Sequence, residues 1–230
     1  MEHIKYAKNV LDPDRLRDLK DLCINHFHEI PAYNFCRKEQ ESSNLLEEII
    51  RHLIGRDHHV EYWVRNGECP TLFHVDGNEL QQKFDFVKYG GFDPDQKIEF
   101  PLNNHVLFVN IEPGMEGGVL CLSPYSTYEK GRPICDNSYE PLENSPIIEI
   151  VPKENNLVLW NKPIYHAVSE VTKTDGRKRI TFMFSSWGHV PEIYKDHKHW
   201  TNFRTTFHHD NDSSADRSHC LPQPMEFDLK

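Results

Sequence analysis

Long apolar runs are missing from this sequence. None approaches the roughly 18 residues that a membrane-spanning helix needs. The first ten residues, MEHIKYAKNV, also lack the apolar stretch that characterises a signal peptide. We therefore expect a cytoplasmic protein that does not contact a membrane.

Clustered positive charge is scarce as well. The formal net charge is −10, and the basic residues do not gather anywhere except in the short run GRKR at residues 176–179. An acidic protein repels the phosphates of nucleic acids unless its basic residues form a patch. We therefore expect no nucleic-acid partner.

Cysteine pairs with metal-binding spacing are absent. The six cysteines are irregularly spaced and form no CxxC motif, which argues against a zinc knuckle. Free thiols in a reducing compartment are the simplest interpretation. An even number of cysteines also permits disulfides without requiring them. Internal repeats are absent too. A chain of 230 residues is long enough for one large domain or two very small ones, and we expect a single domain over residues 1–230.

Two helices are predicted in the first part of the chain. In LDPDRLRDLKDLCINHF, Asp12 is a suitable N-cap and Pro13 suits the first helical turn. In SSNLLEEIIRHLIG, Asn44 and Glu47 resemble a capping box, and Gly55 can end the helix. Residues 1–58 are thus predicted to be a helical flank.

From about residue 60 the pattern changes to short segments rich in β-branched and aromatic residues, separated by Gly, Pro, Asn and Asp. This pattern predicts strands over residues 60–187 that form a β-sandwich or jelly roll, with the helices packed on one outer face. The predicted strands include residues 83–89, 117–124 and 164–171, and Trp160 is predicted to lie in the core. Residues 125–146 are long, polar and aperiodic, and we predict a loop there that can act as a lid. Residues 188–230 are rich in histidine but lack regular ligand spacing, so a solvated extension is preferred over a metal site.

The segment TLFHVDGNEL contains the first candidate site residues. Residues two apart in a strand point to the same face, so His74 and Asp76 can contact one ion. A competing interpretation also exists, because Asp-Gly between strands is a strong signal for a hairpin turn. The local sequence does not choose between them.

A second candidate segment lies far along the chain, in NNLVLWNKPIYHAVSEVTKTDGRKRITFMFSSW. His166 would complete a set of two histidines and one carboxylate, which occupies one face of an octahedral iron(II) and leaves three positions open. Two of these positions can chelate a 2-oxo acid and the third can take O2. A planar guanidinium suits the distant carboxylate of such an acid, and the hydroxyl of Thr181 shares a strand face with Arg179.

Taken together, HxD, a distal histidine and Arg-x-Thr resemble the pattern of the iron(II)/2-oxoglutarate-dependent dioxygenase superfamily. The stretch HAVSEV and the GG of EPGMEGGVLCLSP look most like its prolyl-4-hydroxylase-type branch, and the likeness covers roughly residues 60–187. The resemblance implies a double-stranded β-helix, the jelly roll also found in cupins, in a mainly β protein with flanking α-helices. It implies His74, Asp76 and His166 as iron ligands, and Arg179 as the 2-oxoglutarate anchor.

The anchor position has alternatives. Members of this branch often carry lysine there, so Arg177, Lys178 and Arg179 are all candidates, and Arg177 shares a strand face with Arg179. Arg179 is preferred because it alone forms Arg-x-Thr, whereas Arg177 is interpreted as a solvated charge at the turn.

The resemblance implies an enzyme that uses Fe(II), 2-oxoglutarate and O2 to oxidise an unactivated C–H bond, most simply by hydroxylation. A small molecule or an amino acid is the preferred substrate, and a peptidyl substrate remains an alternative. Two rival classes are a cupin-like metal-binding protein without oxygen chemistry and a barrel that binds without turnover. Arg179 argues against the first, and the presence of all three ligand residues argues against the second.

Overall fold

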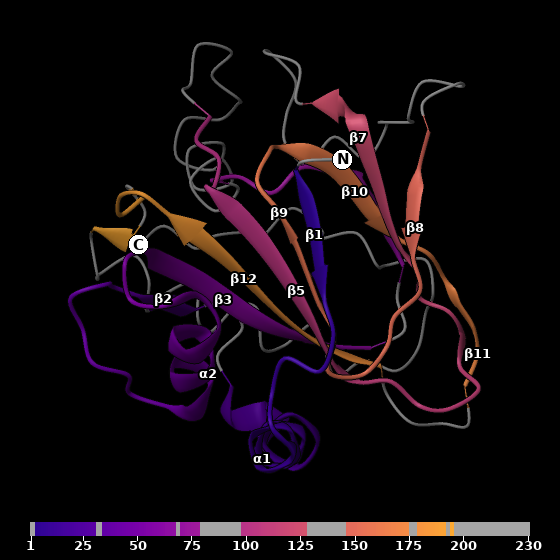
Figure 1. Cartoon of the computed structure of the whole chain (residues 1–230), viewed down its shortest axis with the longest axis horizontal. Helices are drawn as coiled ribbons and strands as arrows, with labels where there is room; N and C mark the ends of the chain where they lie inside the picture. Colours follow the sequence, from indigo (N-terminus) through magenta and orange to yellow (C-terminus); the bar gives the residue numbers. More distant parts are fainter. Residues whose placement is uncertain are drawn as a thin grey trace, which may run out of the picture.

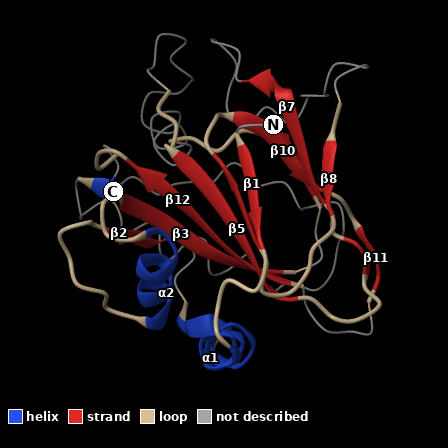
Figure 2. Ribbon diagram, in the orientation of Figure 1, coloured by secondary structure: helices blue, strands red, loops and turns tan. Residues whose placement is uncertain are grey.

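Strands dominate the structure, a computed structural model that describes residues 3–30, 34–67, 70–78, 98–127, 146–174, 179–191 and 194–195 (Figures 1 and 2). In these ranges the helices are α1 (Pro13–Asn25), α2 (Leu45–Ile54) and the short 3-10 turn η1 (Phe27–Glu29). The strands are β1 (Ile4–Ala7), β2 (Asn34–Cys36), β3 (His59–Asn66), β4 (Thr71–His74), β5 (Asn103–Asn110), β6 (Glu116–Gly117), β7 (Leu120–Thr127), β8 (Ile148–Ile150), β9 (Leu157–Trp160), β10 (Ile164–Val168), β11 (Val171–Lys173) and β12 (Ile180–Trp187).

The strands form two main sheets and one small ribbon. The major sheet has the order β1-β9-β5-β12-β3-β2, the minor sheet has the order β4-β10-β7-β8, and β6 pairs with β11. All strand pairings in the described ranges are antiparallel, and the chain passes repeatedly from one main sheet to the other between β3 and β12. This winding is a double-stranded β-helix, so the predicted mainly β jelly-roll core is confirmed.

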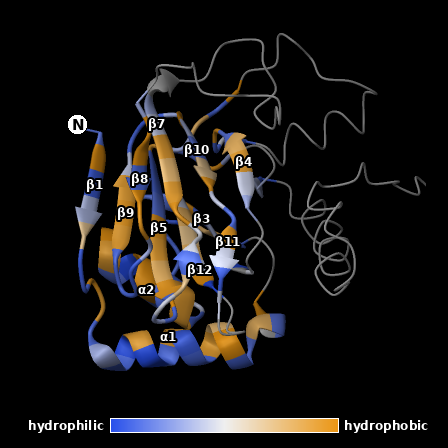
Figure 3. Cartoon of the chain, turned by 90° about the vertical axis from the view of Figure 1, so that its right-hand side faces the viewer, coloured by the Kyte–Doolittle hydropathy of each residue, from blue (hydrophilic) through white to orange (hydrophobic). Residues whose placement is uncertain are grey.

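Two apolar cores cover the two faces of the major sheet. One face packs against α1 and α2, and Ile180, Phe182 and Phe184 of β12 belong to that core. The other face meets the minor sheet, and there Phe108 and Trp160 pack with Leu122. Figure 3 shows hydrophobic colour on the neighbouring strands β9 and β5, and mixed colours along α1. The predicted packing of the helices on one outer face is confirmed.

Strand parity on β12 decides which side chains reach the space between the two main sheets. Because successive side chains alternate between faces, Thr181 and Met183 point away from the helices when Ile180 and Phe182 point toward them. Met183 indeed packs on the core between the sheets. Arg179, immediately before β12, shares this inward parity.

Both helix starts are capped as predicted. The Asp12 carboxylate accepts a hydrogen bond from the Arg15 backbone N–H at 2.9 Å, and the Asn44 side-chain oxygen accepts one from the Glu47 N–H at 3.0 Å. The predicted capping box differs in one detail, because the Glu47 carboxylate accepts from the N–H of Ser43 and not from that of Asn44. The helix α2 ends at Gly55, whose φ of 78° is easily adopted by glycine.

Asn44→Ala is expected to lower the free energy of unfolding by about 1–2 kcal/mol, the upper range for loss of an N-cap. The upper range applies because Asn44 also donates to the hydroxyl of buried Tyr62 at 3.1 Å, which ties the cap to β3. Chemical denaturation measures the change. Asn44→Ser keeps a capping oxygen and serves as the control, so an equal loss in both variants would contradict the capping argument.

The first part of the chain contributes more than helices. β1 pairs with β9 at one edge of the major sheet, and β2 pairs with β3 at the other. Both strands are very short, so their sequences carry too little periodicity to be recognised.

The bounds of two predicted strands differ from those in the structure. The strand predicted to end at Pro124 continues as β7 to Thr127, because Pro124 lies in a bulge of the β7–β10 ladder, where no N–H is needed. The strand predicted over residues 164–171 divides into β10 and β11. The strand predicted over residues 83–89 and most of the predicted lid, residues 128–145, lie outside the described residues.

No helix in the described part of the chain is long and apolar enough to cross a membrane. The cysteines described as free thiols are Cys23, Cys36 and Cys121.

Candidate metal centre and anion site

Two histidines on neighbouring strands of the minor sheet lie side by side on the same face. His74 ends β4, and His166 lies in β10 directly opposite it in the antiparallel register. Residues that are directly opposite in such a pair point to the same face, and the two ring centroids are 4.2 Å apart. Long-range strand pairing therefore brings together the two histidines that were predicted to share a site.

Asp76 completes the cluster, because it follows His74 by two residues and returns to the same side of the chain. One carboxylate oxygen lies 3.7 Å from Nε2 of His74, and the other lies 3.4 Å from Nε2 of His166. The three candidate ligand atoms all lie within 4.8 Å of one another. Metal bonds to nitrogen or oxygen of about 2.0–2.2 Å place neighbouring ligands about 3 Å apart, so movements of roughly 1–2 Å would bring all three atoms onto one ion.

Backbone carbonyls orient both imidazole rings. Nδ1 of His74 lies 2.8 Å from the carbonyl oxygen of Leu72, and Nδ1 of His166 lies 3.1 Å from that of Ile164. A carbonyl oxygen only accepts, so each Nδ1 carries the proton in these contacts. The lone pair of a neutral ring is then on Nε2, which faces Asp76. Metal-binding histidines commonly have such an outer hydrogen bond.

The protonation states also suit metal binding. Burial, followed by the charge of His166, lowers the pKa of His74 to about 4, so this ring is neutral at pH 7. Burial acts to raise the pKa of Asp76, but the charge and hydrogen bond of His166 and the charge of His74 outweigh it and lower the pKa. A neutral imidazole and an ionised carboxylate are the forms that bind cations.

The Asp-Gly hairpin interpretation fails in the structure. β4 pairs with β10, and the residue after Gly77, Asn78, exchanges hydrogen bonds with Glu99. Asp76 and Gly77 therefore do not form the tip of a tight hairpin, since the chain continues through residues outside the described ranges before it returns at Glu99.

Arg179 is a buried cation for which the described residues offer no counterion. Its residue is 4% exposed, and its Nε is buried with no hydrogen-bond partner. Within the described ranges no carboxylate pairs with its guanidinium, and its ring neighbour is Phe108, 5.8 Å from Cζ to the centroid. Burial, followed by the charge of Arg65, lowers its pKa to about 10, so it stays protonated at neutral pH. A buried cation without a partner is costly unless a ligand supplies the negative charge.

Thr181 lies near Arg179 on the inward-facing side of β12 and is 1% exposed. Arg65 of β3 is directly opposite Thr181 in the register, so it also faces the space between the sheets. The sequence analysis did not identify Arg65 as a site residue. A signal was available, because Val64 packs in the core beside the helices, and alternation along a strand then places Arg65 on the opposite face, toward the minor sheet. Arg177 lies outside the described residues.

One aromatic side chain packs directly against the metal-ligand cluster. Trp160, predicted as core, is 1% exposed and packs beside His166 with ring centroids 4.9 Å apart.

Of the histidines after residue 187, His189 is described and its Nε2 contacts the Glu99 carboxylate at 2.9 Å, away from the His74 cluster. The remaining histidines of that region lie outside the described residues.

Comparison with known proteins supports the fold assignment. No family model matches the sequence, and no curated protein sequence matches it. A solved structure of the non-heme alpha-ketoglutarate-dependent epimerase SnoN from nogalamycin biosynthesis aligns with 80% of this chain and 78% of its own, at 10% identity and a TM-score of 0.51. A prolyl-4-hydroxylase from Pseudomonas putida aligns with 82% of this chain and 94% of its own (14% identity, TM-score 0.48). HygX from Streptomyces hygroscopicus, with nickel and 2-oxoglutarate bound, aligns with 83% and 85% (11% identity, TM-score 0.47).

The match to SnoN shows that this chain shares the fold of a 2-oxoglutarate-dependent enzyme. The predicted likeness to that superfamily is thereby confirmed at the level of the fold. Identities of this size carry no information about substrate or reaction.

Proposed function

We propose that this protein is an iron(II)- and 2-oxoglutarate-dependent oxygenase that hydroxylates an unactivated C–H bond of a small molecule or an amino acid. One observation carries the proposal. The space between the two sheets contains both a metal-ligand set of two histidines and one aspartate and a buried arginine with no counterion in the described ranges.

In this proposal His74, Asp76 and His166 hold the metal, and their arrangement leaves the remaining coordination positions open. When bound there, iron(II) supplies the activation of O2, which protein side chains cannot provide. The carbonyls of Leu72 and Ile164 keep both rings oriented with Nε2 toward the metal. The pairing of β4 with β10 holds both histidines in place before the metal binds.

Arg179 binds the distal carboxylate of 2-oxoglutarate in this proposal, and the Thr181 hydroxyl adds a hydrogen bond. The guanidinium suits an anion, and 2-oxoglutarate offers a 2-oxo acid group for the metal and a second carboxylate for the arginine. The apolar walls around the site, including Phe108 and Trp160, exclude water from the reacting groups.

The overall reaction balances as one substrate C–H bond, one O2 and one 2-oxoglutarate giving an alcohol, succinate and CO2. One oxygen atom of O2 enters the alcohol and the other enters succinate. The two electrons from decarboxylation and the two from the C–H bond account for the reduction of O2.

Succinate release in the presence of iron(II), 2-oxoglutarate and ascorbate is the test. Amino acids, other small metabolites and peptides are screened for stimulation of succinate formation, with mass spectrometry of each hit. We expect at least one small molecule to stimulate release and to gain one oxygen atom. Stimulation by peptides alone would move the substrate class to proteins, and a product of unchanged mass would replace hydroxylation with another outcome. No 2-oxoglutarate binding by the metal-loaded protein would contradict the proposal as a whole.

A further inference from the structure

The position of Arg179 has to come from packing. Buried arginines are usually held by a carboxylate, but the described residues offer Arg179 none. The charge of Arg65 repels it, since this charge contributes to lowering the pKa of Arg179. Within the described part of the chain, the direction of the guanidinium therefore depends on the groups against which the side chain lies.

Gly118 is one of these groups. A Cβ atom added at Gly118 would lie 3.0 Å from both Cδ and Nε of Arg179, and 3.1 Å from Cγ2 of Val171. Contacts this short are tighter than normal packing, so even one methyl group would be wedged between the two side chains. The arginine therefore occupies space that exists because residue 118 has no side chain.

The backbone at Gly118 has little freedom to move away. A Cβ atom at the preceding Gly117 would lie 2.0 Å from the carbonyl oxygen of Glu170, which shows how closely the two backbone segments approach. The N–H of Gly118 donates to that same carbonyl at 3.0 Å, and the N–H of Val119 donates to the Ser169 hydroxyl at 2.9 Å.

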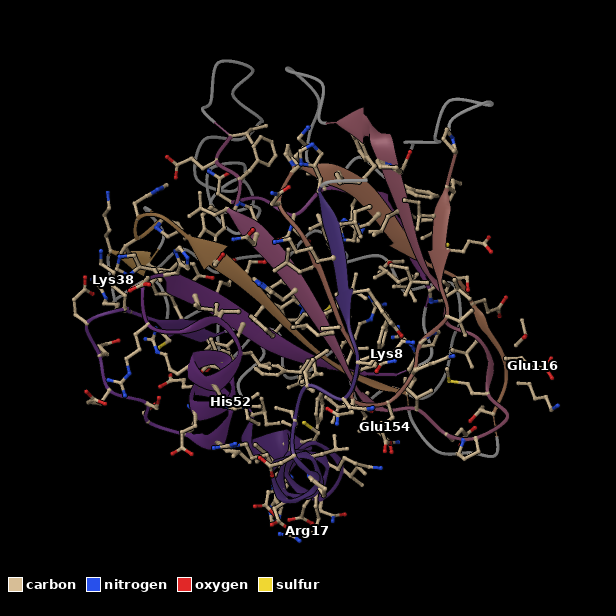
Figure 4. The ribbon with its side chains drawn as sticks, in the orientation of Figure 1. Lys8, Arg17, Lys38, His52, Glu116 and Glu154 are labelled. Carbon is tan, nitrogen blue, oxygen red and sulfur yellow. The ribbon has the colours of Figure 1, made fainter. Side chains whose placement is uncertain are left out.

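Pairing of β6 with β11 also restrains the backbone just before Gly118. Gly117 pairs with Val171 in the β6–β11 register. The ion pair of Glu116 with Lys173, 2.8 Å, lies at the outer end of the ribbon, where Figure 4 shows Glu116 pointing away from the sheets. If a side chain is added at residue 118, Arg179 has to shift, because hydrogen bonds and strand pairing restrain the backbone at residues 117–119.

We propose that Gly118 is a positioning residue for cosubstrate binding: its missing side chain forms the slot in which Arg179 lies, and the slot sets where the guanidinium meets the distal carboxylate. This proposal rests on the proposed function above. It gives the second glycine of the GG pair a role that the resemblance alone does not assign.

A simpler explanation is that residue 118 is glycine only because its φ is +63°, a left-handed conformation that glycine adopts easily. Gly114 is a matched control for that explanation. It lies in the loop just before the same ribbon, its φ is +85°, and an added Cβ would have nothing within 4 Å. Alanine at either position introduces a similar backbone strain, but only Gly118→Ala introduces a contact with Arg179.

The experiment compares Gly118→Ala, Gly114→Ala and wild type by calorimetric binding of 2-oxoglutarate to the Mn(II)-loaded protein. Mn(II) affinity and steady-state kinetics with iron are measured alongside. We expect Gly118→Ala to weaken 2-oxoglutarate binding and raise its KM by at least about fivefold, since a charge-assisted hydrogen bond is misaligned. The kcat at saturating 2-oxoglutarate and the Mn(II) affinity should stay within about twofold of wild type. Gly114→Ala should stay within about twofold in every measurement.

Equal 2-oxoglutarate affinities for Gly118→Ala and Gly114→Ala would overturn the proposal. If Gly118→Ala proves too unstable, the pair Gly118→Asn and Gly114→Asn replaces it, because asparagine tolerates positive φ better than alanine. The same two outcomes then decide the matter. An Arg179→Gln variant is measured in parallel, and unchanged 2-oxoglutarate binding there would contradict the anchor itself, which separates the failure of the proposed function from the failure of this inference.

Discussion

Asp76→Ala is expected to reduce substrate-dependent succinate formation by more than about 100-fold. Loss of groups that only orient metal ligands costs about 10- to 100-fold in metal affinity or activity, and loss of a ligand should cost more. Asp76 is also the charge that faces Nε2 of both histidines, so the affinity for Mn(II) should fall with the activity. The free energy of unfolding of the metal-free protein should change by about 1 kcal/mol or less, as for a typical point substitution.

The control for Asp76 is Asp57→Ala, at an exposed aspartate in the bend after α2. It removes the same carboxylate without contact to the cluster, so activity and Mn(II) affinity should remain at the wild-type level. Full turnover in Asp76→Ala would mean that this residue never binds the metal, and the enzyme assignment would then lose its basis.

Arg179→Gln is expected to weaken 2-oxoglutarate binding by about 1.5–3 kcal/mol, the scale for hydrogen bonds to charged groups, which corresponds to roughly 10- to 150-fold. The substitution should have the opposite effect on the metal-free protein without ligand. It removes a buried charge for which the described residues offer no counterion, so the free energy of unfolding should stay the same or rise. Stability and cosubstrate affinity should thus change in opposite directions.

Thermal denaturation measures both effects. The metal-free protein without ligand gives the change in stability, and the Mn(II)-loaded protein with and without 2-oxoglutarate gives the change in cosubstrate affinity. For wild type, ligand at about 100 times its Kd adds about 2.7 kcal/mol to the free energy of unfolding, and most of this gain should disappear in Arg179→Gln. Arg177→Gln is the control, because it removes the arginine two residues before Arg179 in the sequence. A larger loss in the Arg177 variant than in the Arg179 variant would move the anchor to Arg177.

Local signals predicted the parts of the fold that local interactions form. Asp12 and Asn44 were identified as helix caps because a short polar side chain before an apolar stripe stabilises a helix start whatever surrounds it. The strands of the two sheets were recognised from β-branched and aromatic residues between turn residues. β1 and β2 were missed, because strands this short are stabilised by the edges of the major sheet and not by their own sequence.

The sequence by itself determined which chemical groups are available and which of them share a strand face. The spacing of His74 and Asp76 and the parity of Arg179 and Thr181 follow from the two-residue period of a strand. Those relations hold over a few residues, so they can be read without knowing the fold.

Only the tertiary structure decided which of these groups meet. His166 lies opposite His74 because β10 pairs with β4, a contact between strands that are distant in sequence. The absence of a counterion for Arg179 among the described residues, and the room left for it by Gly118, depend on a ribbon and two sheets whose strands are distant in sequence. The physical reason is that the free energy of burying or pairing a group depends on which residues it contacts. The order of strands in the sheets decides these contacts between distant parts of the chain.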